Sequence, residues 1–399
     1  MSKPISPVLI VGAGPVGLTT ALLLARQGIA STILQRGADI ERTGSRAIVL
    51  LRDTLEAFDE AAPGTGARLA ARGITWRVKR TYHKDRLLFS ETYPESKDAR
   101  YPLFVNVSQV ETDSVLLHAA RTQYPGYISI VFDQRVTGLR QTQQQVTAIT
   151  QAGREFVADF VVGADGAHSA VRKLLGIELV GRRSENRFLI ADVRADLDIG
   201  YERRFYYSPP GNPGYQAFML PQPDRVWRFD WQVAPDTRLD ELTKGDVLDA
   251  KIRALVGRDS SYEVLWTSLY QFNNTYAKEF GQGRVFLAGD AAHQFSPFGG
   301  RGLNSGIGDA RALAAHLVRA IKDKTAIHSL PAYNAERQRA AIANLNATGR
   351  VLRVLVPATP LHRAVRHLAL RGARHFAFCR RYVDSGPYAV SQRPVTQIA

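Results

Sequence analysis

A glycine-rich turn between an apolar run and a helix opens this sequence, and it restricts the fold more than any other feature. Residues 8–11 are apolar, and the turn Gly12-Ala13-Gly14-Pro15-Val16-Gly17 follows directly. We expect a strand over residues 8–11, a helix over residues 18–27 that ends at Gly28, and a second strand over residues 30–34. The pattern predicts a Rossmann-like unit that binds a dinucleotide.

Each glycine of this turn has a separate task in such a unit. Gly12 permits the tight turn, Gly14 lets the backbone approach a pyrophosphate, and Gly17 allows the helix to pack closely on the strand. Pro15 and Val16 lie between them, and we expect both at the cofactor as well. The motif occurs once in the chain, so we expect no second Rossmann domain for NAD(P)H and no disulfide-reductase type of enzyme.

The end of the second strand departs from the usual pattern. An acid at this position normally binds the ribose hydroxyls of the dinucleotide. This chain has Gln35 followed by Arg36. A glutamine amide still offers one or two hydrogen bonds to the ribose, so we expect both residues at the cofactor and leave open how well Gln35 replaces the acid.

Residues 284–309 repeat the strand, turn and helix arrangement with an acid at the turn. An apolar strand over residues 285–288 leads into Gly289 and Asp290, and a glycine-rich turn with Gly300 and Gly302 opens a helix near Leu303 and Asn304. An acidic side chain at the carboxyl end of a strand can accept a hydrogen bond from a ligand hydroxyl. The free N–H groups of a helix start suit a group that becomes anionic. We therefore expect Asp290 to hold a polyhydroxylated chain and the helix start to stabilise a reduced flavin ring; the alternative is an ordinary turn with surface glycines.

A third strand and turn lie between these two. We expect a buried strand over residues 156–162, followed by Gly163-Ala164-Asp165-Gly166 and a short helix. Asp165 is suited to a turn beside phosphates, and a plain Asp-Gly turn is the alternative. His168, two residues after this turn, is expected to be a cap or a surface residue.

Between residues 182 and 272 the pattern changes to alternating aromatic and polar residues. Trp227, Phe229 and Trp231 would share one face of a strand and Arg228, Asp230 and Gln232 the other. We expect this sheet and a helix near residues 215–220 to form a substrate pocket. Arg204 and Arg228 could bind a substrate carboxylate there or form structural salt bridges.

The expected fold is α/β (α+β), a Rossmann-like FAD-binding domain with an inserted antiparallel-sheet substrate domain and C-terminal helices. The expected division is a first FAD-binding part at 1–75, substrate-domain strands at 76–100, a second FAD-binding part at 101–181, the substrate-binding sheet at 182–275, a third FAD-binding part at 276–345 and a helical segment at 346–399.

Composition narrows the classes of function. Of the 399 residues 22% are charged and 45% hydrophobic, which is ordinary for a globular enzyme. The sequence contains no run of 18 apolar residues, so we expect no membrane-spanning helix. The single cysteine, Cys379, is consistent with a reducing cytoplasm, where we expect the protein. The net charge of +15 rests partly on arginines late in the chain. We interpret them as a solvated helical surface; nucleic acid and an anionic membrane surface are the alternatives.

Three such motifs in this order resemble the single-component FAD-dependent aromatic hydroxylases of the para-hydroxybenzoate hydroxylase fold. The resemblance covers about residues 7–385, and in detail it is to the phenol monooxygenases typified by 3-(3-hydroxyphenyl)propionate hydroxylase. Three segments carry it: Trp227-Arg228-Phe229-Asp230-Trp231-Gln232, Ser296-Pro297-Phe298-Gly299-Gly300-Arg301-Gly302 and Tyr333-Asn334-Ala335-Glu336-Arg337. Larger relatives continue into a thioredoxin-like domain, which we do not expect in this chain.

The resemblance also implies roles for individual residues. It places Asp290 on the flavin ribityl chain, Asp165 between flavin and nicotinamide, and Pro297 over the ring where oxygen reacts. Ser45, Arg46, Ala47 and Gln109 match positions that contact FAD, and Arg46 matches a residue that helps to hold the ring as it swings toward NAD(P)H once a substrate is bound. His293, close to Asp290, is a candidate catalytic residue, although packing beside the flavin is the favoured interpretation.

The same resemblance implies that the chain is an FAD-dependent NAD(P)H:aromatic monooxygenase. The expected cofactor is FAD, and the expected co-substrate is NADPH or NADH. A flavin C4a-hydroperoxide formed with O2 would hydroxylate a small phenolic or related aromatic substrate, and an anionic aromatic compound is one candidate. We expect no metal and no nucleic acid, and a homodimer is an open arrangement. The alternatives are a flavoprotein that oxygenates a non-aromatic or polycyclic natural product, and a basic surface-binding protein with a vestigial nucleotide fold. A flavin halogenase is disfavoured because its Trp-x-Trp-x-Ile-Pro element is missing.

Overall fold

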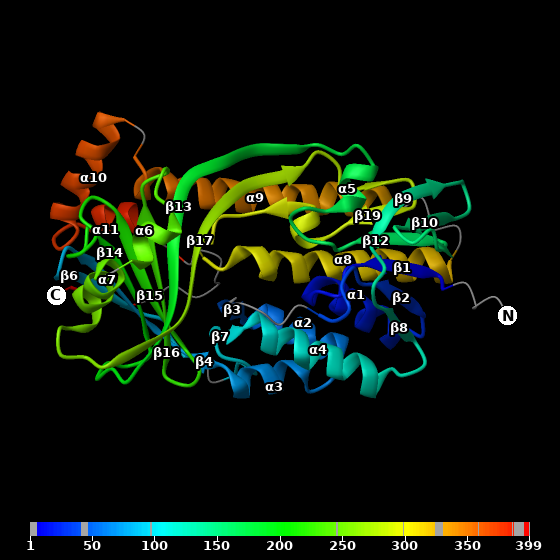
Figure 1. The fold of residues 1–399 in the computed structure, drawn as a ribbon, viewed down its shortest axis with the longest axis horizontal. Helices are drawn as coiled ribbons and strands as arrows, with labels where there is room; N and C mark the ends of the chain where they lie inside the picture. The colour runs from blue at the N-terminus through cyan, green and yellow to red at the C-terminus, as the bar shows by residue number, and fades with distance from the viewer. Residues whose placement is uncertain are drawn as a thin grey trace.

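The structure is a computed structural model, and it describes residues 6–40, 47–95, 98–244, 246–297, 299–323, 330–357, 359–384, 386 and 395–398. Figure 1 shows an elongated molecule with a parallel sheet and its helices toward one end and a large, mostly antiparallel sheet toward the other. The long helices α8 (Arg301–Lys322) and α9 (Leu330–Leu355) run between the two ends.

A six-stranded sheet forms the first layer of the nucleotide-binding end in the described residues. Its order is β18 (Gly281–Gln282), β19 (Val285–Leu287), β12 (Phe160–Gly163), β1 (Val8–Val11), β2 (Ser31–Leu34) and β8 (Ile128–Val131). The four pairs from β19 to β8 are parallel. Parallel strands are covered on both faces, which explains why β1, β12 and β19 are apolar throughout and fully buried.

Helices and two small sheets surround this layer. The helices are α1 (Pro15–Arg26), α2 (Arg52–Ala61), α3 (Thr65–Arg72), α4 (Gln109–Gln123) and α5 (Ala170–Leu174). One small sheet joins β3 (Ala47–Leu51), β7 (Phe104–Ser108) and β4 (Ile74–Thr75); the other joins β11 (Glu155–Ala158), β10 (Val146–Thr150) and β9 (Val136–Gln141). The expected strands at 8–11 and 30–34 and the expected helix after the glycine turn are confirmed, although the helix begins at Pro15 because proline is favoured in a first turn.

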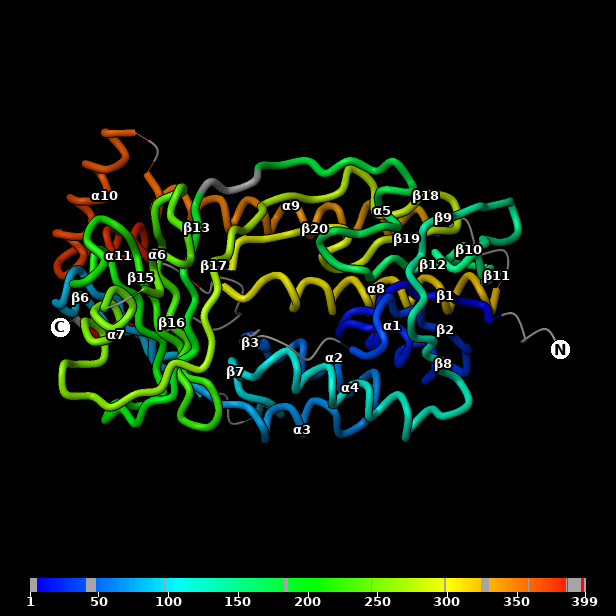
Figure 2. The backbone as a smooth tube through the Cα atoms, viewed as in Figure 1, coloured from blue at the N-terminus to red at the C-terminus, as the bar shows by residue number. Residues whose placement is uncertain are grey.

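The other end of the molecule is a nine-stranded sheet within the described ranges. Its order is β20 (His293–Gln294), β17 (Tyr262–Ala277), β13 (Leu179–Ala195), β16 (Val226–Val233), β15 (Gln216–Gln222), β14 (Glu202–Tyr207), β5 (Val78–His83), β6 (Arg86–Thr92) and β21 (Val395–Ile398). All pairs are antiparallel except β14 with β5. In Figure 2 the long strands β13 and β17 extend from this sheet toward the parallel sheet, so the two ends share strands as well as helices.

Each face of the large sheet has its own cover. Trp227, Phe229 and Trp231 lie in one apolar cluster with side chains of α6 (Leu239–Thr243) and α7 (Val247–Val256), which confirms the shared face. A second cluster joins the sheet to the end of α9 and to α10 (Pro360–Gly372) and α11 (Ala377–Val383). No helix within the described ranges combines the length and the apolar character needed to cross a bilayer.

Two local expectations were wrong. The segment near residues 215–220 is not a helix but strand β15, because it pairs with β14 and β16 over most of its length. The expected single strand over residues 156–162 is two strands. β11 pairs antiparallel with β10, whereas β12 pairs parallel with β1, and Asp159 separates them. Distant partners decide both cases, and the local apolar pattern does not show them.

Candidate FAD and substrate site

The three sequence motifs meet at one edge of the parallel sheet. Strands β19, β12 and β1 are neighbours, and each motif follows the carboxyl end of one of them. Contacts between the motifs are direct. A Cβ on Gly12, whose φ is +107°, would lie 2.4 Å from the carbonyl oxygen of Ala164, and a Cβ on Gly289 would lie 2.9 Å from Cγ2 of Val16. The backbone thus packs at distances that only glycine allows.

The loop between β1 and α1 leaves room for a ligand. A Cβ on Gly14 would meet no atom within 4 Å, so the space in front of this residue is open. The backbone N–H of Ala13 donates to Oε1 of Gln35 at 3.1 Å. Gln35, at the end of β2, therefore holds the loop between β1 and α1 in place. It occupies the position where a ribose-binding acid is usual, and the neighbouring Arg36 is exposed.

Two helices begin at this edge without a side-chain cap. The N-cap residues are Gly14 for α1 and Gly300 for α8, neither helix has an acidic residue in its first turn, and Pro15 is the first residue of α1. Val16 lies between them, because a Cβ on Gly306 of α8 would be 2.8 Å from its Cγ2. Uncapped N–H groups at helix starts favour anionic ligands.

Asp165 leaves an acceptor without a partner at the same edge. Its Oδ2 accepts hydrogen bonds from the backbone N–H groups of Ala170 at 2.6 Å and Val171 at 3.2 Å. Its Oδ1 is buried and has no hydrogen-bond partner among the described residues. The first oxygen caps α5, and the second can accept a hydrogen bond from a bound molecule. His168 nearby is exposed, as expected for a surface residue.

Asp290 lies exposed in the short 3-10 turn η1 (Gly289–Ala291), directly after β19. Gly289 has a φ of +64°, which turns the chain sharply at this point. Burial raises the pKa of the Tyr270 hydroxyl on β17, and the nearby Asp290 carboxylate raises it further. Asp290 thus places a carboxyl side chain at this turn, near the hydroxyl of Tyr270.

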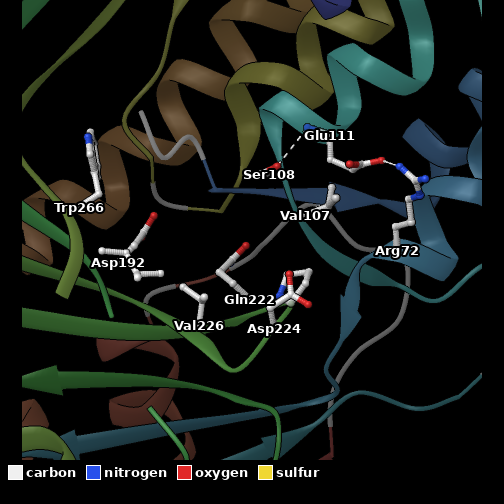
Figure 3. A pocket seen from close by; sticks show the side chains of 11 residues that line it. Arg72, Val107, Ser108, Glu111, Asp192, Gln222, Asp224, Val226 and Trp266 are labelled. Carbon is white, nitrogen blue, oxygen red and sulfur yellow. Dashed lines mark hydrogen bonds and ion pairs between the residues drawn. The ribbon is translucent and has the colours of Figure 1, made fainter. Parts of the chain in front are cut away.

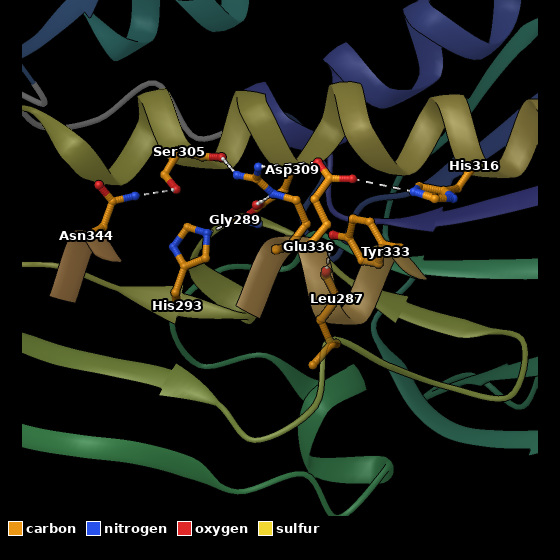
Figure 4. Close-up of polar contacts among 10 residues, drawn as sticks. Leu287, Gly289, His293, Ser305, Asp309, His316, Tyr333, Glu336 and Asn344 are labelled. Carbon is orange, nitrogen blue, oxygen red and sulfur yellow. Dashed lines mark hydrogen bonds and ion pairs between the residues drawn. The ribbon is translucent and has the colours of Figure 1, made fainter. Parts of the chain in front are cut away.

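The buried carboxylate of Asp309 holds the turn at Gly289 in place by hydrogen bonds (Figure 4). Oδ2 of Asp309, on α8, accepts from the backbone N–H of Gly289 at 2.9 Å and lies 2.6 Å from Nε2 of His293. Its Oδ1 accepts from Nε of Arg337, on α9, at 2.7 Å. Burial works to raise the pKa of Asp309, but His293 and Arg337 outweigh it and the pKa is lowered. The carboxylate therefore stays ionised and ties α8, α9 and the turn together.

This arrangement determines what His293 can do. Its side chain is fully buried, Nε2 contacts Asp309, and the ring stacks on Phe295 with centroids 4.6 Å apart. The geometry favours the packing interpretation over a catalytic role. Asp309 and Arg337 had no assigned role in the sequence interpretation. The available signal was an acid that follows the glycine-rich first turns of one helix and an arginine on the next helix.

The side chain of Asn304 has a similar positioning role. Its Oδ1 accepts from the backbone N–H of Leu51 at 2.9 Å and from Oγ1 of Thr54 at 2.6 Å. Its Nδ2 donates to the carbonyl oxygens of Val49 at 2.7 Å and of Gly300. The amide is thus used within the protein, and it joins the start of α8 to β3 and α2.

The remaining expected site residues differ in their exposure. Gly17 is buried at the start of α1, whereas Gly302 and Leu303 are half-buried in the first turn of α8. Pro297 is exposed, and its carbonyl oxygen accepts from the N–H of Gly300 at 3.2 Å. Gln109 begins α4 and is half-buried. Ser45 and Arg46 lie outside the described residues.

A cavity of about 590 Å³ separates the start of α4 from the large sheet (Figure 3). On the nucleotide-binding side it is lined by Val107 and Ser108, next to Gln109. On the sheet side the lining includes Val226 of β16 and Asp192 of β13. Such a volume with mixed lining is typical of a site for a small organic molecule.

The two arginines expected near the pocket are both in ion pairs. Nε of Arg228 lies 2.9 Å from Oδ1 of Asp192 in a buried pair, and Nε of Arg204 lies 2.6 Å from Oε1 of Glu202. The structural interpretation of these arginines therefore holds. Burial raises the pKa of Asp230, the next residue of β16 on the face of Arg228, to about 7, although the charge of Arg228 opposes the rise.

These residues fit FAD. The open space before Gly14 and the uncapped starts of α1 and α8 are suited to a pyrophosphate and to an anionic ring. The unpartnered Oδ1 of Asp165 and the exposed Asp290 supply acceptors on either side. We find this donor and acceptor set along one sheet edge, as an extended dinucleotide requires.

Comparisons with known proteins agree with this geometry. A family model described as "FAD binding domain" matches residues 6–348. The 3-(3-hydroxy-phenyl)propionate/3-hydroxycinnamic acid hydroxylase of Mycobacterium sp. (strain KMS) is 29% identical over 377 residues, which are 94% of this chain and 64% of that protein. The chain thus spans less than two thirds of the length of that relative.

Two further relatives are similar over most of the chain. A flavin-dependent monooxygenase of Mycobacteroides abscessus (strain ATCC 19977) is 34% identical over 338 residues, covering 79% of this chain and 67% of that protein. The crystal structure of p-nitrophenol 4-monooxygenase PnpA from Pseudomonas putida DLL-E4 superimposes with a TM-score of 0.80 at 25% identity, covering 95% of this chain and 96% of that one.

Proposed function

This chain belongs to the FAD-binding domain family of flavoproteins, and we propose that it is an FAD-dependent monooxygenase that hydroxylates a phenolic or related aromatic compound with NAD(P)H and O2. The observation that carries the proposal is the convergence of three strand ends and two uncapped helix starts at one edge of the parallel sheet, together with a cavity of about 590 Å³ at the start of α4. The relatives described above are hydroxylases and monooxygenases.

The chain's own residues bind and orient the cofactor in this proposal. The loop from Gly12 to Gly17 and the start of α1 hold the pyrophosphate, and Asp290 accepts hydrogen bonds from the ribityl hydroxyls. The uncapped start of α8 would hold the flavin ring and stabilise negative charge on it. Bound FAD supplies the redox chemistry with NAD(P)H and O2.

Three further residues complete the site as proposed. Pro297 would lie at the flavin ring, and Gln109 would help to hold the cofactor from the start of α4. Arg46 stays a prediction, because it lies outside the described residues. His293 supports the turn through Asp309 and is not assigned a chemical step.

The cavity beside α4 is the proposed substrate site. Trp266 and Val226 offer apolar contact for an aromatic ring, and Asp192 and Gln222 offer polar groups that fix its orientation. The protein excludes water around the ring and positions the carbon to be hydroxylated. We place the enzyme in the cytoplasm, because one cysteine and a need for NAD(P)H are consistent with a reducing compartment.

The test is flavin reduction with and without a panel of phenols, phenolic acids and polycyclic aromatics. The purified protein should be yellow and contain FAD, and the right substrate should raise the rate of NAD(P)H oxidation by at least about tenfold. Arg46→Ala should reduce this stimulation, while Glu60→Gln at an exposed ion pair serves as the control. Flavin reduction that is equally fast with and without every substrate would contradict the proposal and favour a simple oxidase or reductase.

A further inference from the structure

Helix α10 is apolar on two sides, although only one of them packs against the protein. Ala369 and Leu370 face the core and are buried. Leu361, Val365 and Leu368, spaced by four and three residues, are 71%, 39% and 65% exposed. This spacing places them on one stripe of the helix. Exposed apolar side chains that gather on one stripe of a helix mark an interaction surface, so the outer stripe calls for a partner.

Two aromatic side chains extend the exposed apolar residues onto the next helix. Phe376 is 54% exposed and Phe378 67%, and their ring centroids are 5.6 Å apart at the start of α11. Helix α11 packs against α10, and Figure 1 places both at the end of the molecule away from the parallel sheet. We call Leu361, Val365, Leu368, Phe376 and Phe378 the outer apolar surface.

The two helices that carry the outer apolar surface are rich in arginine. Between residues 359 and 384 the sequence has Arg363, Arg366, Arg371, Arg374, Arg380 and Arg381, and a single acid, Asp384, which pairs with Lys79. Arg363, Arg371 and Arg381 are exposed and form no ion pair with any described residue. Within the part of the chain that the structure describes, these three guanidinium groups are therefore not paired with a carboxylate.

We propose that the outer apolar surface and its arginines bind the surface of an anionic phospholipid bilayer. Leucine and phenylalanine side chains on one face, with arginines beside them, are the features by which an amphipathic helix lies in a membrane interface. The apolar side chains enter the boundary between head groups and acyl chains, and the guanidinium groups contact lipid phosphates. The net charge of +15 adds long-range attraction to such a surface.

Charge argues against a second copy of the chain as the occupant. A two-fold interface brings the same patch of each copy together. Such an interface would bring the exposed Arg363, Arg371 and Arg381 of both copies together, and like charges at an interface disfavour association. An anionic lipid surface, by contrast, offers phosphate groups that can pair with the same arginines. This surface is separate from the FAD and substrate site, so the proposal goes beyond the proposed function.

Vesicle sedimentation of the full-length FAD-loaded protein tests the proposal. The protein should bind vesicles of phosphatidylcholine and phosphatidylglycerol in roughly two to one ratio, and bind vesicles of phosphatidylcholine alone at least about tenfold more weakly. High salt should also weaken binding. Equal binding to both kinds of vesicle, or no binding to the anionic ones, would overturn it.

Variants separate the apolar and the charged contributions. Leu361→Ser/Leu368→Ser and Arg363→Gln/Arg371→Gln should each lower the vesicle partition coefficient by about tenfold or more, with unchanged FAD absorbance. Tyr127→Ser, at an exposed aromatic in the nucleotide-binding end, is the control and should bind as the parent does. Unchanged binding in either double variant contradicts the proposal.

Two independent readouts complete the test. Phe378→Trp should give a blue-shifted emission with anionic vesicles, because the indole leaves water for the interface; an unshifted spectrum counts against insertion. Light scattering should show that Leu361→Ser/Leu368→Ser leaves the oligomeric state unchanged. A dimer that this variant converts to a monomer would assign the surface to a second copy and overturn the membrane proposal.

Discussion

Replacing Asp309 with asparagine should destabilise the protein by about 3 kcal/mol. The carboxylate accepts from Gly289, contacts His293 and pairs with Arg337, all at 2.6–2.9 Å. Breaking a buried pair by neutralising one partner costs about 3–5 kcal/mol, because the other charge stays buried. The Arg337 side chain is 14% exposed and lies 3.8 Å from Glu336, so the lower end of this range applies.

Urea unfolding of the FAD-free protein measures this difference. Glu60→Gln is the matched control, because it breaks an exposed pair with Arg311 on the same helix and should cost less than about 1 kcal/mol. The folded-state pKa of Asp309 is lowered, so its contribution is complete above about pH 4 and is lost as the pH falls further. If Asp309→Asn unfolds within about 1 kcal/mol of the parent at neutral pH, the network does not hold the turn as described.

Three other perturbations have defined outcomes. Asp290→Ala should weaken FAD binding by about tenfold or more, since a hydrogen bond to a charged group contributes roughly 1.5–3 kcal/mol; full flavin retention after dialysis would rule out its role. Gly14→Val should fold but purify with little FAD, because the space before Gly14 is open, whereas Gly12→Ala should destabilise the apoprotein by meeting the Ala164 carbonyl at 2.4 Å; equal FAD occupancy in Gly14→Val and the parent refutes the pyrophosphate assignment. The raised pKa of Asp230, about 7, means that the folded protein loses stability as the pH rises from about 4 to 7. Asp230→Asn should reduce that slope by about one proton, as urea midpoints across this range will show, and an unchanged slope would place the titration elsewhere.

The strands before Gly12 and Gly289 could be predicted because their signals are local. The run before Gly12 is apolar without alternation, and the glycine spacing after it admits few other structures. The same holds for the alternation that identified the faces of β16. The predicted bounds of these elements agree with the structure to within a few residues. The helix expected to begin at residue 18, for example, begins at Pro15.

The supporting contacts could not be predicted because their partners are far away in the sequence. Asn304 bonds to groups about 250 residues earlier, and Asp309 bonds to an arginine on the next helix. An apolar run such as the one in β15 suits a helix or a strand equally, and only its pairing with β14 and β16 decides. Side chains that position a site therefore emerge from the fold, whereas the backbone motifs that form it are visible in the sequence.

The central claim is that this chain transfers one oxygen atom from O2 to an aromatic ring. The most direct measurement is mass spectrometry of the product formed under ¹⁸O2 with FAD-loaded protein, NAD(P)H and the phenol that best stimulates NAD(P)H oxidation. The account predicts a hydroxylated product that carries a single ¹⁸O atom, with no label from H2¹⁸O in the reciprocal experiment. NAD(P)H consumption that yields only hydrogen peroxide with every aromatic compound tested would contradict it.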